Sequence, residues 1–231
     1  MTRVVLFDID GTLLLSHGAG RTAMEAALVE TFGTPGPADY RYDGKTDKLI
    51  VRESMRREGF ADDVIDARMA LVIDRYLANL EVALRDEARR AYALPGIHEL
   101  IAEVERADDL VLGLLTGNVV PGARAKLAAI DVAFERFVVG AYGSDHEDRP
   151  QLPPIARERA SALLGYEVPG DRLVIIGDTP ADVHCGRGVG ARAIAVATGG
   201  FSVDELAAHD PAATFADLRD TARVLEAIRD A

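Results

Sequence analysis

Residues 4–13, with the sequence VVLFDIDGTL, constrain the fold more than any other stretch of the chain. Residues 4–7 are all apolar, as expected for a strand that is buried on both faces of a parallel sheet. The apolar run ends at Asp8, and Asp10 follows two positions later, before a Gly-Thr turn. Two carboxylates at the end of a buried strand are costly unless they are paired, protonated or bound to a metal ion. The alternative is an ordinary strand that ends in an Asp-Gly turn. This motif alone does not decide between a functional pair of carboxylates and such a turn.

The composition disfavours several classes of protein. The 231 residues suffice for one large domain or for a core domain with an insert, and 48% of them are hydrophobic. No apolar run approaches the ~20 residues of a membrane helix, and the first strand begins at once, so we expect neither a membrane segment nor a signal peptide. The single cysteine excludes an intramolecular disulfide framework, and the net charge of −12 disfavours nucleic acid and anionic membranes. We therefore expect a cytoplasmic monomer or homodimer that acts on a small molecule.

The region directly after the first motif has a helical pattern. Apolar residues recur at helical spacing from Met24 to Phe32, in a second stretch that stops near Gly59, and along one face of a longer stretch that begins at Asp62. We predict an all-helical domain at residues 16–88, inserted into an α/β core formed by residues 1–15 and 89–231.

Strands and helices alternate in the rest of the chain. The predicted strands cover residues 111–115, 137–139, 173–176 and 193–197, and helices begin near Pro95, Pro121 and Pro153. With the first strand, this order predicts a doubly wound, parallel, five-stranded sheet of the Rossmann-like type. Ligands of such sheets bind at the carboxyl ends of the strands, and Asp8, Thr116 and Asp178 all fall there.

The three aspartates Asp8, Asp10 and Asp178 can meet only if the first and fourth predicted strands are neighbours, which the sequence does not decide. If they meet, their mutual repulsion favours a hard divalent cation such as Mg²⁺, which prefers carboxylate and carbonyl oxygens, water and phosphate. A carboxylate beside such an ion can attack a phosphoryl group and form an aspartyl-phosphate. A second one can protonate the leaving oxygen and later deprotonate the hydrolytic water.

Phosphoryl transfer also needs groups that hold the phosphate oxygens. Thr116 offers a hydroxyl for this purpose, and Gly117 and Asn118 offer backbone N–H groups. A nearby Arg or Lys would compensate charge when the nucleophile is covalently occupied.

Three motifs, DIDGTL, LLTGN and GDTPADV, occur in this order and resemble three of the four motifs of the haloacid dehalogenase superfamily of phosphohydrolases. The resemblance extends over the whole chain, and the helical insert is similar to that superfamily's first cap type. The loop at residues 44–47 is similar to the Gly-x-Thr-Asp loop of phosphoglycolate-phosphatase-like members. The resemblance therefore implies a Mg²⁺-dependent phosphatase for a small, phosphoglycolate-like monoester.

The resemblance also implies roles for individual residues. Asp8 would be the nucleophile, Asp10 the general acid and base, and Thr116 a phosphate ligand. Mg²⁺ would be held by Asp8, the carbonyl oxygen of Asp10 and Asp178, with Asp182 close by or behind these ligands. Relatives that break C–halogen or C–P bonds lack a carboxylate at the position of Asp10, so its presence argues against those reactions.

One departure from the superfamily pattern concerns the charge-compensating residue. A Lys-Pro pair is usual before the fourth strand, whereas this chain has Arg149-Pro150. We assign the role to Arg149, although arginine is larger and planar and does not act as a point charge. Arg157 and Arg159 on the following helix are competitors, and the acidic residues 145, 147 and 148 could pair with Arg149 instead.

Four residues of the helical insert are candidate substrate contacts. Arg21 and Lys45 are candidate anion contacts, while Thr46 and Asp47 could either line the substrate pocket or cap the following helix. Cys185, three residues after Asp182, is interpreted as a small packing residue.

Other activities remain open at this point. A sugar-phosphate mutase uses the same two aspartates and differs in how the cap controls water. Related caps also accept nucleotides and pyrophosphate. A phospho-receiver domain and a catalytically silent binding protein are remote alternatives, since a receiver domain has about half this length and no helical insert.

Overall fold

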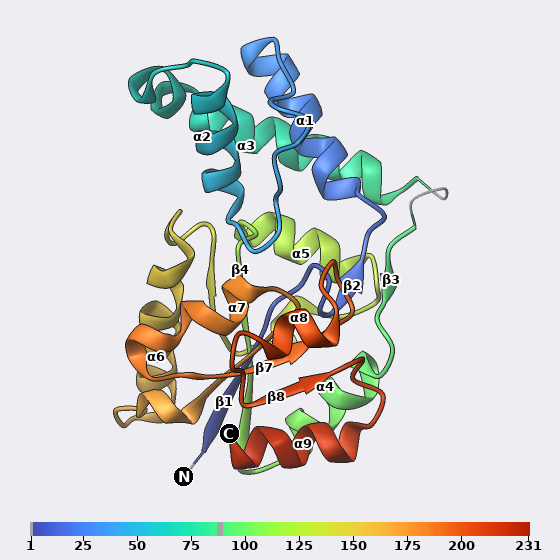
Figure 1. Ribbon diagram of the computed structural model, residues 1–231, viewed down its shortest axis with the longest axis vertical. Helices are drawn as coiled ribbons and strands as arrows, with labels where there is room; N and C mark the ends of the chain where they lie inside the picture. Colours follow the sequence, from blue (N-terminus) through green and yellow to red (C-terminus); the bar gives the residue numbers. More distant parts are fainter. Residues whose placement is uncertain (1, 87–89) are drawn as a thin grey trace.

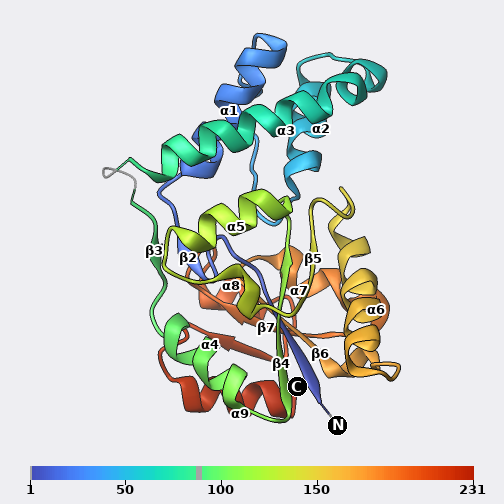
Figure 2. The ribbon, with the colours of Figure 1, turned by 180° about the vertical axis from the view of Figure 1, so that it is seen from behind.

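The computed structural model describes residues 2–86 and 90–231 of the chain. Its core is a parallel six-stranded sheet with the strand order β5-β4-β1-β6-β7-β8, covered by helices on both faces (Figures 1 and 2). The strands are β1 (Arg3–Phe7), β4 (Leu110–Thr116), β5 (Val139–Tyr142), β6 (Leu173–Gly177), β7 (Arg192–Val196) and β8 (Ala213–Phe215). The helices of the core are α4 (Ile97–Arg106), α5 (Val120–Ala128), α6 (Leu152–Leu164), α7 (Pro180–Cys185), α8 (Val203–Ala207) and α9 (Thr221–Asp230).

The first strand divides the core between its two faces. Val5 and Phe7 pack with the inward sides of α4, α5 and α9, whereas Val4 and Leu6 pack with α6. This alternation leaves residues 4–7 wholly buried, as the continuous apolar run predicts. The predicted parallel doubly wound architecture is therefore confirmed.

Two details of the predicted sheet are wrong. The sheet has six strands rather than five, because Ala213–Phe215 adds a short edge strand beside β7. The third predicted strand, at residues 137–139, is displaced, since β5 covers Val139–Tyr142. Residues 134–136 form a 3-10 turn just before it, and Val138 is exposed.

The helical insert consists of α1 (Ala19–Phe32), α2 (Asp47–Arg57) and α3 (Asp62–Leu84), with the loops that join them. The chain enters and leaves it through an antiparallel ribbon of β2 (Leu14–Leu15) and β3 (Tyr92–Ala93). The insert has an apolar cluster of its own, including Met24, Val72 and Leu80. The predicted boundary at residues 88 and 89 lies outside the described residues. Within the described part of the chain, no helix is long and apolar enough to cross a membrane.

The strand order determines where the polar residues meet. β1 pairs with β4 on one side and with β6 on the other, so the first and fourth predicted strands are neighbours. The carboxyl ends of all three strands point toward the helical insert (Figure 1). The residues that follow these strands therefore converge between the core and the insert.

Candidate active site

Asp8 and Asp10 follow β1 at the junction of the core and the insert. The Asp8 side chain is buried, whereas the Asp10 side chain is 44% exposed. Gly11, with φ of +80°, turns the chain, and a Cβ atom there would lie 2.3 Å from Asp178 Oδ2. A glycine is therefore needed at this position both for the positive φ and for the close approach of Asp178.

Asp178 and Asp182 come from the end of β6 and the start of α7. The hydroxyl of Thr12 donates to Asp178 Oδ1 at 3.2 Å. Asp182 Oδ2 accepts from the backbone N–H and the hydroxyl of Thr179 in the capping box of α7. Oxygen atoms of Asp8, Asp178 and Asp182 all lie within 4.8 Å of one another.

Arg149 is the cation of this cluster. It is 4% exposed, its Nη2 lies 3.4 Å from Asp8 Oδ2, and the same nitrogen donates to Asp182 Oδ1. The two competing arginines lie elsewhere, since Arg157 pairs with Glu167 and Arg159 with Asp145. Among the described residues, nothing accepts a hydrogen bond from the buried Nε of Arg149.

The acidic neighbours of Arg149 do not hold it. Asp145 binds Arg159, and Glu147 accepts from Arg52 of α2. Arg149 is therefore the basic residue that faces Asp8.

Burial dominates the electrostatics of the cluster. It raises the pKa of Asp8 to about 6 against the opposing effect of Arg149. It also raises the pKa of Asp178 well above the usual range, and the charges of Asp182 and Asp8 add to this rise. Burial alone would lower the pKa of Arg149, but the Asp182 and Asp8 carboxylates outweigh it, and the pKa of Arg149 is raised.

The donor set of the cluster suits a divalent cation. The cluster holds three buried carboxylates, two of which pair with the Arg149 guanidinium, so full ionisation of all three leaves two negative charges uncompensated. Because Asp182 is already engaged by Thr179 and Arg149, Asp8 and Asp178 are the carboxylates with oxygens left for a metal ion. The cluster can therefore hold a metal ion, as hard cations bind carboxylate oxygens.

The loop after β4 forms a second side of the site. Thr116 is buried, and its hydroxyl accepts from the backbone N–H of Asn118 at 3.3 Å and from the Asn118 amide at 2.9 Å. The same amide donates to Asp10 Oδ2 at 2.8 Å. A Cβ atom at Gly117 would lie 2.1 Å from the carbonyl oxygen of Lys45, so the insert touches this loop through backbone atoms.

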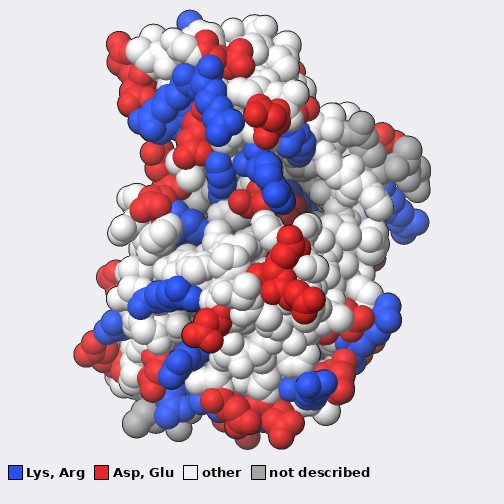
Figure 3. Space-filling view, viewed as in Figure 1, with Lys and Arg blue, Asp and Glu red and all other residues white. Residues whose placement is uncertain are grey.

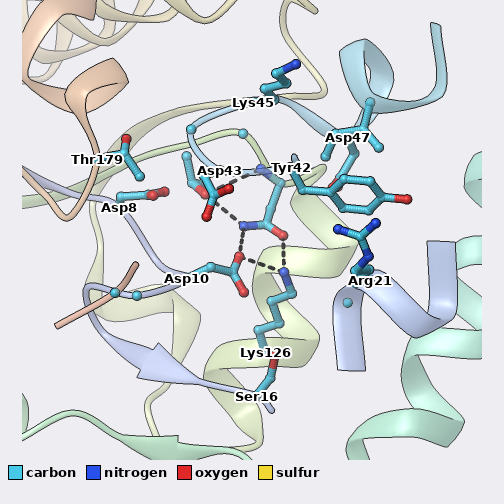
Figure 4. Close-up of a pocket in the computed structure, with 18 of the residues that line it drawn as sticks. Asp8, Asp10, Ser16, Arg21, Tyr42, Asp43, Lys45, Asp47, Lys126 and Thr179 are labelled. Carbon is cyan, nitrogen blue, oxygen red and sulfur yellow. Dashed lines mark hydrogen bonds and ion pairs between the residues drawn. The ribbon is translucent and has the colours of Figure 1, made fainter. Parts of the chain in front are cut away.

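The four candidate contacts on the insert differ in their surroundings. The Lys45 ammonium is engaged by Glu53 at 2.6 Å and by the Tyr40 hydroxyl at 2.8 Å, and Figure 4 shows it pointing away from Asp8 and Asp10. Arg21 lines the cavity and stacks over the Tyr42 ring at 4.6 Å.

Thr46 and Asp47 hold the insert against the core. Thr46 is the N-cap of α2, accepts from the backbone N–H of Leu49 and donates to the carbonyl oxygen of Glu147 at 2.6 Å. It does not line the cavity. Asp47 accepts from the backbone N–H of Val119 at 2.8 Å, and its own N–H donates to the Gly117 carbonyl. Thr46 therefore serves as a helix cap and as a contact between insert and core, whereas Asp47 makes such a contact and also lines the cavity.

A cavity of about 350 Å³ lies between the core and the insert. Its core wall carries Asp8, Asp10 and Arg149. Its insert wall carries both the aromatic ring of Tyr42 and charged side chains, among them that of Arg21 (Figure 4). On the face shown in Figure 3, basic and acidic side chains are interspersed around the junction of the insert and the core.

One polar residue of the cavity was not expected from the sequence. Lys126 of α5 is 4% exposed, and its ammonium donates to Asp10 Oδ2 and to Asn118 Oδ1, both at 2.6 Å. The sequence could have indicated that this lysine is buried, because its position falls on the same inward face of α5 as Ala123 and Leu127.

Cys185 lies behind the site. Burial raises the pKa of its thiol to about 12, and the side chain packs in the apolar cluster beside α6. Its place among apolar neighbours agrees with a packing residue.

Comparison with known proteins gives the same family over most of the chain. The family model of haloacid dehalogenase-like hydrolases matches residues 5–187. A phosphoglycolate phosphatase of Rhodospirillum rubrum is 27% identical over 221 residues, which cover 94% of this chain and 88% of the relative. A 5'-nucleotidase of Pseudomonas aeruginosa is 29% identical over 225 residues, with coverage of 96% and 95%.

The fold is likewise similar to that of a solved hydrolase from Pseudomonas syringae. The TM-score is 0.72 at 21% identity, and the match covers 98% of each chain. The family match extends from β1 through the end of α7 and so includes every residue of the carboxylate cluster. The chain belongs to the haloacid dehalogenase-like hydrolase family.

Proposed function

We propose that this protein is a Mg²⁺-dependent phosphatase that hydrolyses a small phosphate monoester through an aspartyl-phosphate on Asp8. The observation that carries the proposal is the pairing of buried Asp8 with Arg149 at the wall of a cavity that also holds Asp10. The relatives named as phosphatases support the same reaction class.

The chemistry proceeds in two steps. In the first, an Asp8 oxygen attacks phosphorus and forms the acyl phosphate, while the bond to the leaving oxygen breaks and Asp10 supplies a proton to that oxygen. In the second step, Asp10 takes a proton from water as the water attacks phosphorus. Inorganic phosphate leaves and the Asp8 carboxylate is restored.

The residues around Asp8 would stabilise the charge on the phosphoryl group. The Arg149 guanidinium lies beside the nucleophile and places its positive charge where the phosphoryl group would be attached. The Thr116 hydroxyl and the backbone N–H groups of Gly117 and Asn118 are the proposed phosphate contacts. Fixed donors of this kind account for much of the catalysis of phosphoryl transfer.

Asp8, Asp178 and the carbonyl oxygen of Asp10 would hold the Mg²⁺ ion, with Asp182 behind them. When bound, the ion supplies positive charge to the phosphoryl oxygens and to the crowded carboxylates. The raised pKa values of Asp8 and Asp178 are consistent with a site that is completed by a cation.

The cavity limits the size of the substrate. Its volume of about 350 Å³ is near the lower end of the range of ligand pockets, ~300–1,000 Å³. The insert closes over it, so the ester is enclosed and water is excluded during the reaction. We propose phosphoglycolate as the first substrate to test, because curated relatives over most of the chain carry that name.

Phosphate release from a panel of esters tests the proposal. The panel contains phosphoglycolate, nucleoside monophosphates, hexose phosphates and pyrophosphate, each with Mg²⁺ and with chelator, and Asp8→Asn serves as the inactive control. Metal-dependent release by the wild type is the expected result. No release from any ester by the folded protein would contradict the proposal, and transfer of phosphate between sugar positions would identify a mutase.

A further inference from the structure

Lys126 is a buried lysine that no step above uses. Its ammonium donates to Asp10 Oδ2 and to Asn118 Oδ1, and the Asn118 amide donates to the same Asp10 oxygen (Figure 4). Lysine is almost never fully buried unless it is paired. Here the pairing is with the proposed proton donor, so the lysine is placed where it can affect the reaction.

Elements of the insert surround Lys126. A Cβ atom at Gly20 of α1 would lie 3.3 Å from Lys126 Nζ and 4.0 Å from the hydroxyl oxygen of Tyr76 in α3. Tyr76 and Asp47 of the insert both interact electrostatically with the ammonium. Three helices of the insert therefore enclose the lysine, and its burial depends on the closed arrangement of insert and core.

The contacts leave the two oxygens of Asp10 in different environments. Lys126 and Asn118 both donate to Oδ2, whereas in the described part of the chain no hydrogen bond to Oδ1 is found. The Asp10 carboxyl group is thus held at one oxygen, while its side chain remains 44% exposed at the cavity wall.

We propose that Lys126 is a positioning residue that, together with Asn118, holds Asp10 by Oδ2 so that Oδ1 carries the proton to the leaving oxygen. In the first step the proton moves from Asp10 Oδ1 to the ester oxygen as the P–O bond breaks and its electron pair goes to that oxygen. The inference rests on the proposed function.

The leaving group provides a test that separates positioning from general structural damage. An alkyl phosphate needs a proton on its leaving oxygen, whereas p-nitrophenyl phosphate has a leaving group that departs readily without one. In Lys126→Met, which keeps the length of the side chain and removes the charge, kcat/KM for the alkyl ester should fall by about 100-fold. For p-nitrophenyl phosphate it should fall by less than about threefold, because the first step then depends little on Asp10.

Lys48→Met is the matched control. Lys48 is a lysine of α2 that donates to the Ser144 carbonyl, and its replacement should leave both values of kcat/KM unchanged. The alkyl ester is phosphoglycolate, or another alkyl phosphate of the panel if the wild type prefers it. A wild type without phosphatase activity would refute the proposed function before this comparison begins.

A double substitution keeps the test decisive if Lys126→Met folds poorly, because Asp10→Asn with Lys126→Met removes both charges of the buried pair together. In an Asp10→Asn background the lysine has no carboxylate to position, so adding Lys126→Met should cause no further loss in kcat/KM for the alkyl ester. Unchanged kinetics in Lys126→Met, an equal loss for both esters, or a further loss of similar size in the double variant would each overturn the inference.

Discussion

The guanidinium of Arg149 lies 3.4 Å from the Asp8 carboxylate and binds Asp182 with the same nitrogen. A lysine usually occupies the corresponding position in the superfamily that the motifs resemble. The ammonium of a lysine is a compact point charge, whereas the planar guanidinium presents several donors in a fixed arrangement. One arginine can therefore connect the proposed nucleophile with the start of α7, which carries the acidic residues that follow β6.

Removal of this guanidinium should affect both activity and stability. Arg149→Ala leaves two buried carboxylates without their cation, so we expect a loss of ~3–5 kcal/mol in the free energy of unfolding without metal, together with a large loss of kcat. Arg149→Lys should retain part of the activity. Urea denaturation and steady-state kinetics measure both effects. Arg157→Ala, which removes an arginine paired with Glu167, should behave like the wild type, and unchanged kinetics in Arg149→Ala would refute the assignment.

The role of Asp10 can be tested by a substitution that keeps its shape. In Asp10→Asn the side chain can still accept from Lys126 but cannot deliver a proton, so kcat should fall by ~10²–10⁴-fold. The thermal midpoint should also fall, because the buried Lys126 ammonium loses its carboxylate partner. Steady-state kinetics on an alkyl phosphate and a thermal melt are the two measurements. A loss of less than about threefold would move the acid–base role to another residue.

Metal binding should stabilise the folded protein through Asp178. At a Mg²⁺ concentration 100 times the dissociation constant, mass action adds about 2.7 kcal/mol to the free energy of unfolding. Thermal melts with Mg²⁺ and with chelator should show this rise in the wild type and a much smaller one in Asp178→Asn. In chelator, Asp178→Asn should be at least as stable as the wild type, because it removes a buried carboxylate from a repulsive cluster. An equal metal response in both proteins would place the ion elsewhere.

Asp47 should make stability depend on pH. Its burial raises its pKa to about 6, from 3.8, even though Lys126 and the Val119 N–H oppose the rise. Between these two pH values the folded protein binds more protons than the unfolded chain, so the free energy of unfolding falls as the pH rises from about 4 to about 6. Asp47 contributes at most about 3 kcal/mol to this fall, and above pH 6 its contribution is constant.

Asp47→Asn isolates this contribution, because asparagine can still accept from the Val119 N–H. Urea denaturation in chelator at pH 4.5 and pH 7 should show a smaller decrease for Asp47→Asn than for the wild type. The same decrease in both proteins would mean that Asp47 does not titrate in this range.

The sequence was sufficient to predict the parts of the fold that depend on local pattern. The apolar run before Asp8 identified a buried central strand, and the parallel architecture followed from the alternation of strands and helices. That Asp8 and Asp178 meet depends on the pairing of β1 with β6, a long-range contact that the chain's local pattern does not contain. The edge strand β8 was missed because its three residues are only half-buried and have no clear alternation.

The partners of two charged side chains were beyond the reach of sequence patterns. Lys45 has the charge expected of an anion contact, but Glu53 of the following helix α2, eight residues further along the chain, engages it. Lys126 sits among apolar residues in the sequence, and its partners Asp10 and Asn118 follow β1 and β4, which the sheet places side by side. In both cases the partner of a charged side chain is decided by tertiary packing.

The most direct test of the account is to trap the phosphorylated enzyme. The wild type is mixed with its preferred ester and Mg²⁺, denatured rapidly, and treated with borohydride, which reduces an acyl phosphate and changes the mass of the peptide that carries it. The account predicts the modification at Asp8 in the wild type and none in Asp8→Asn, whose turnover should fall by roughly 10⁴-fold or more. Modification at another residue, or full turnover by Asp8→Asn, would contradict it.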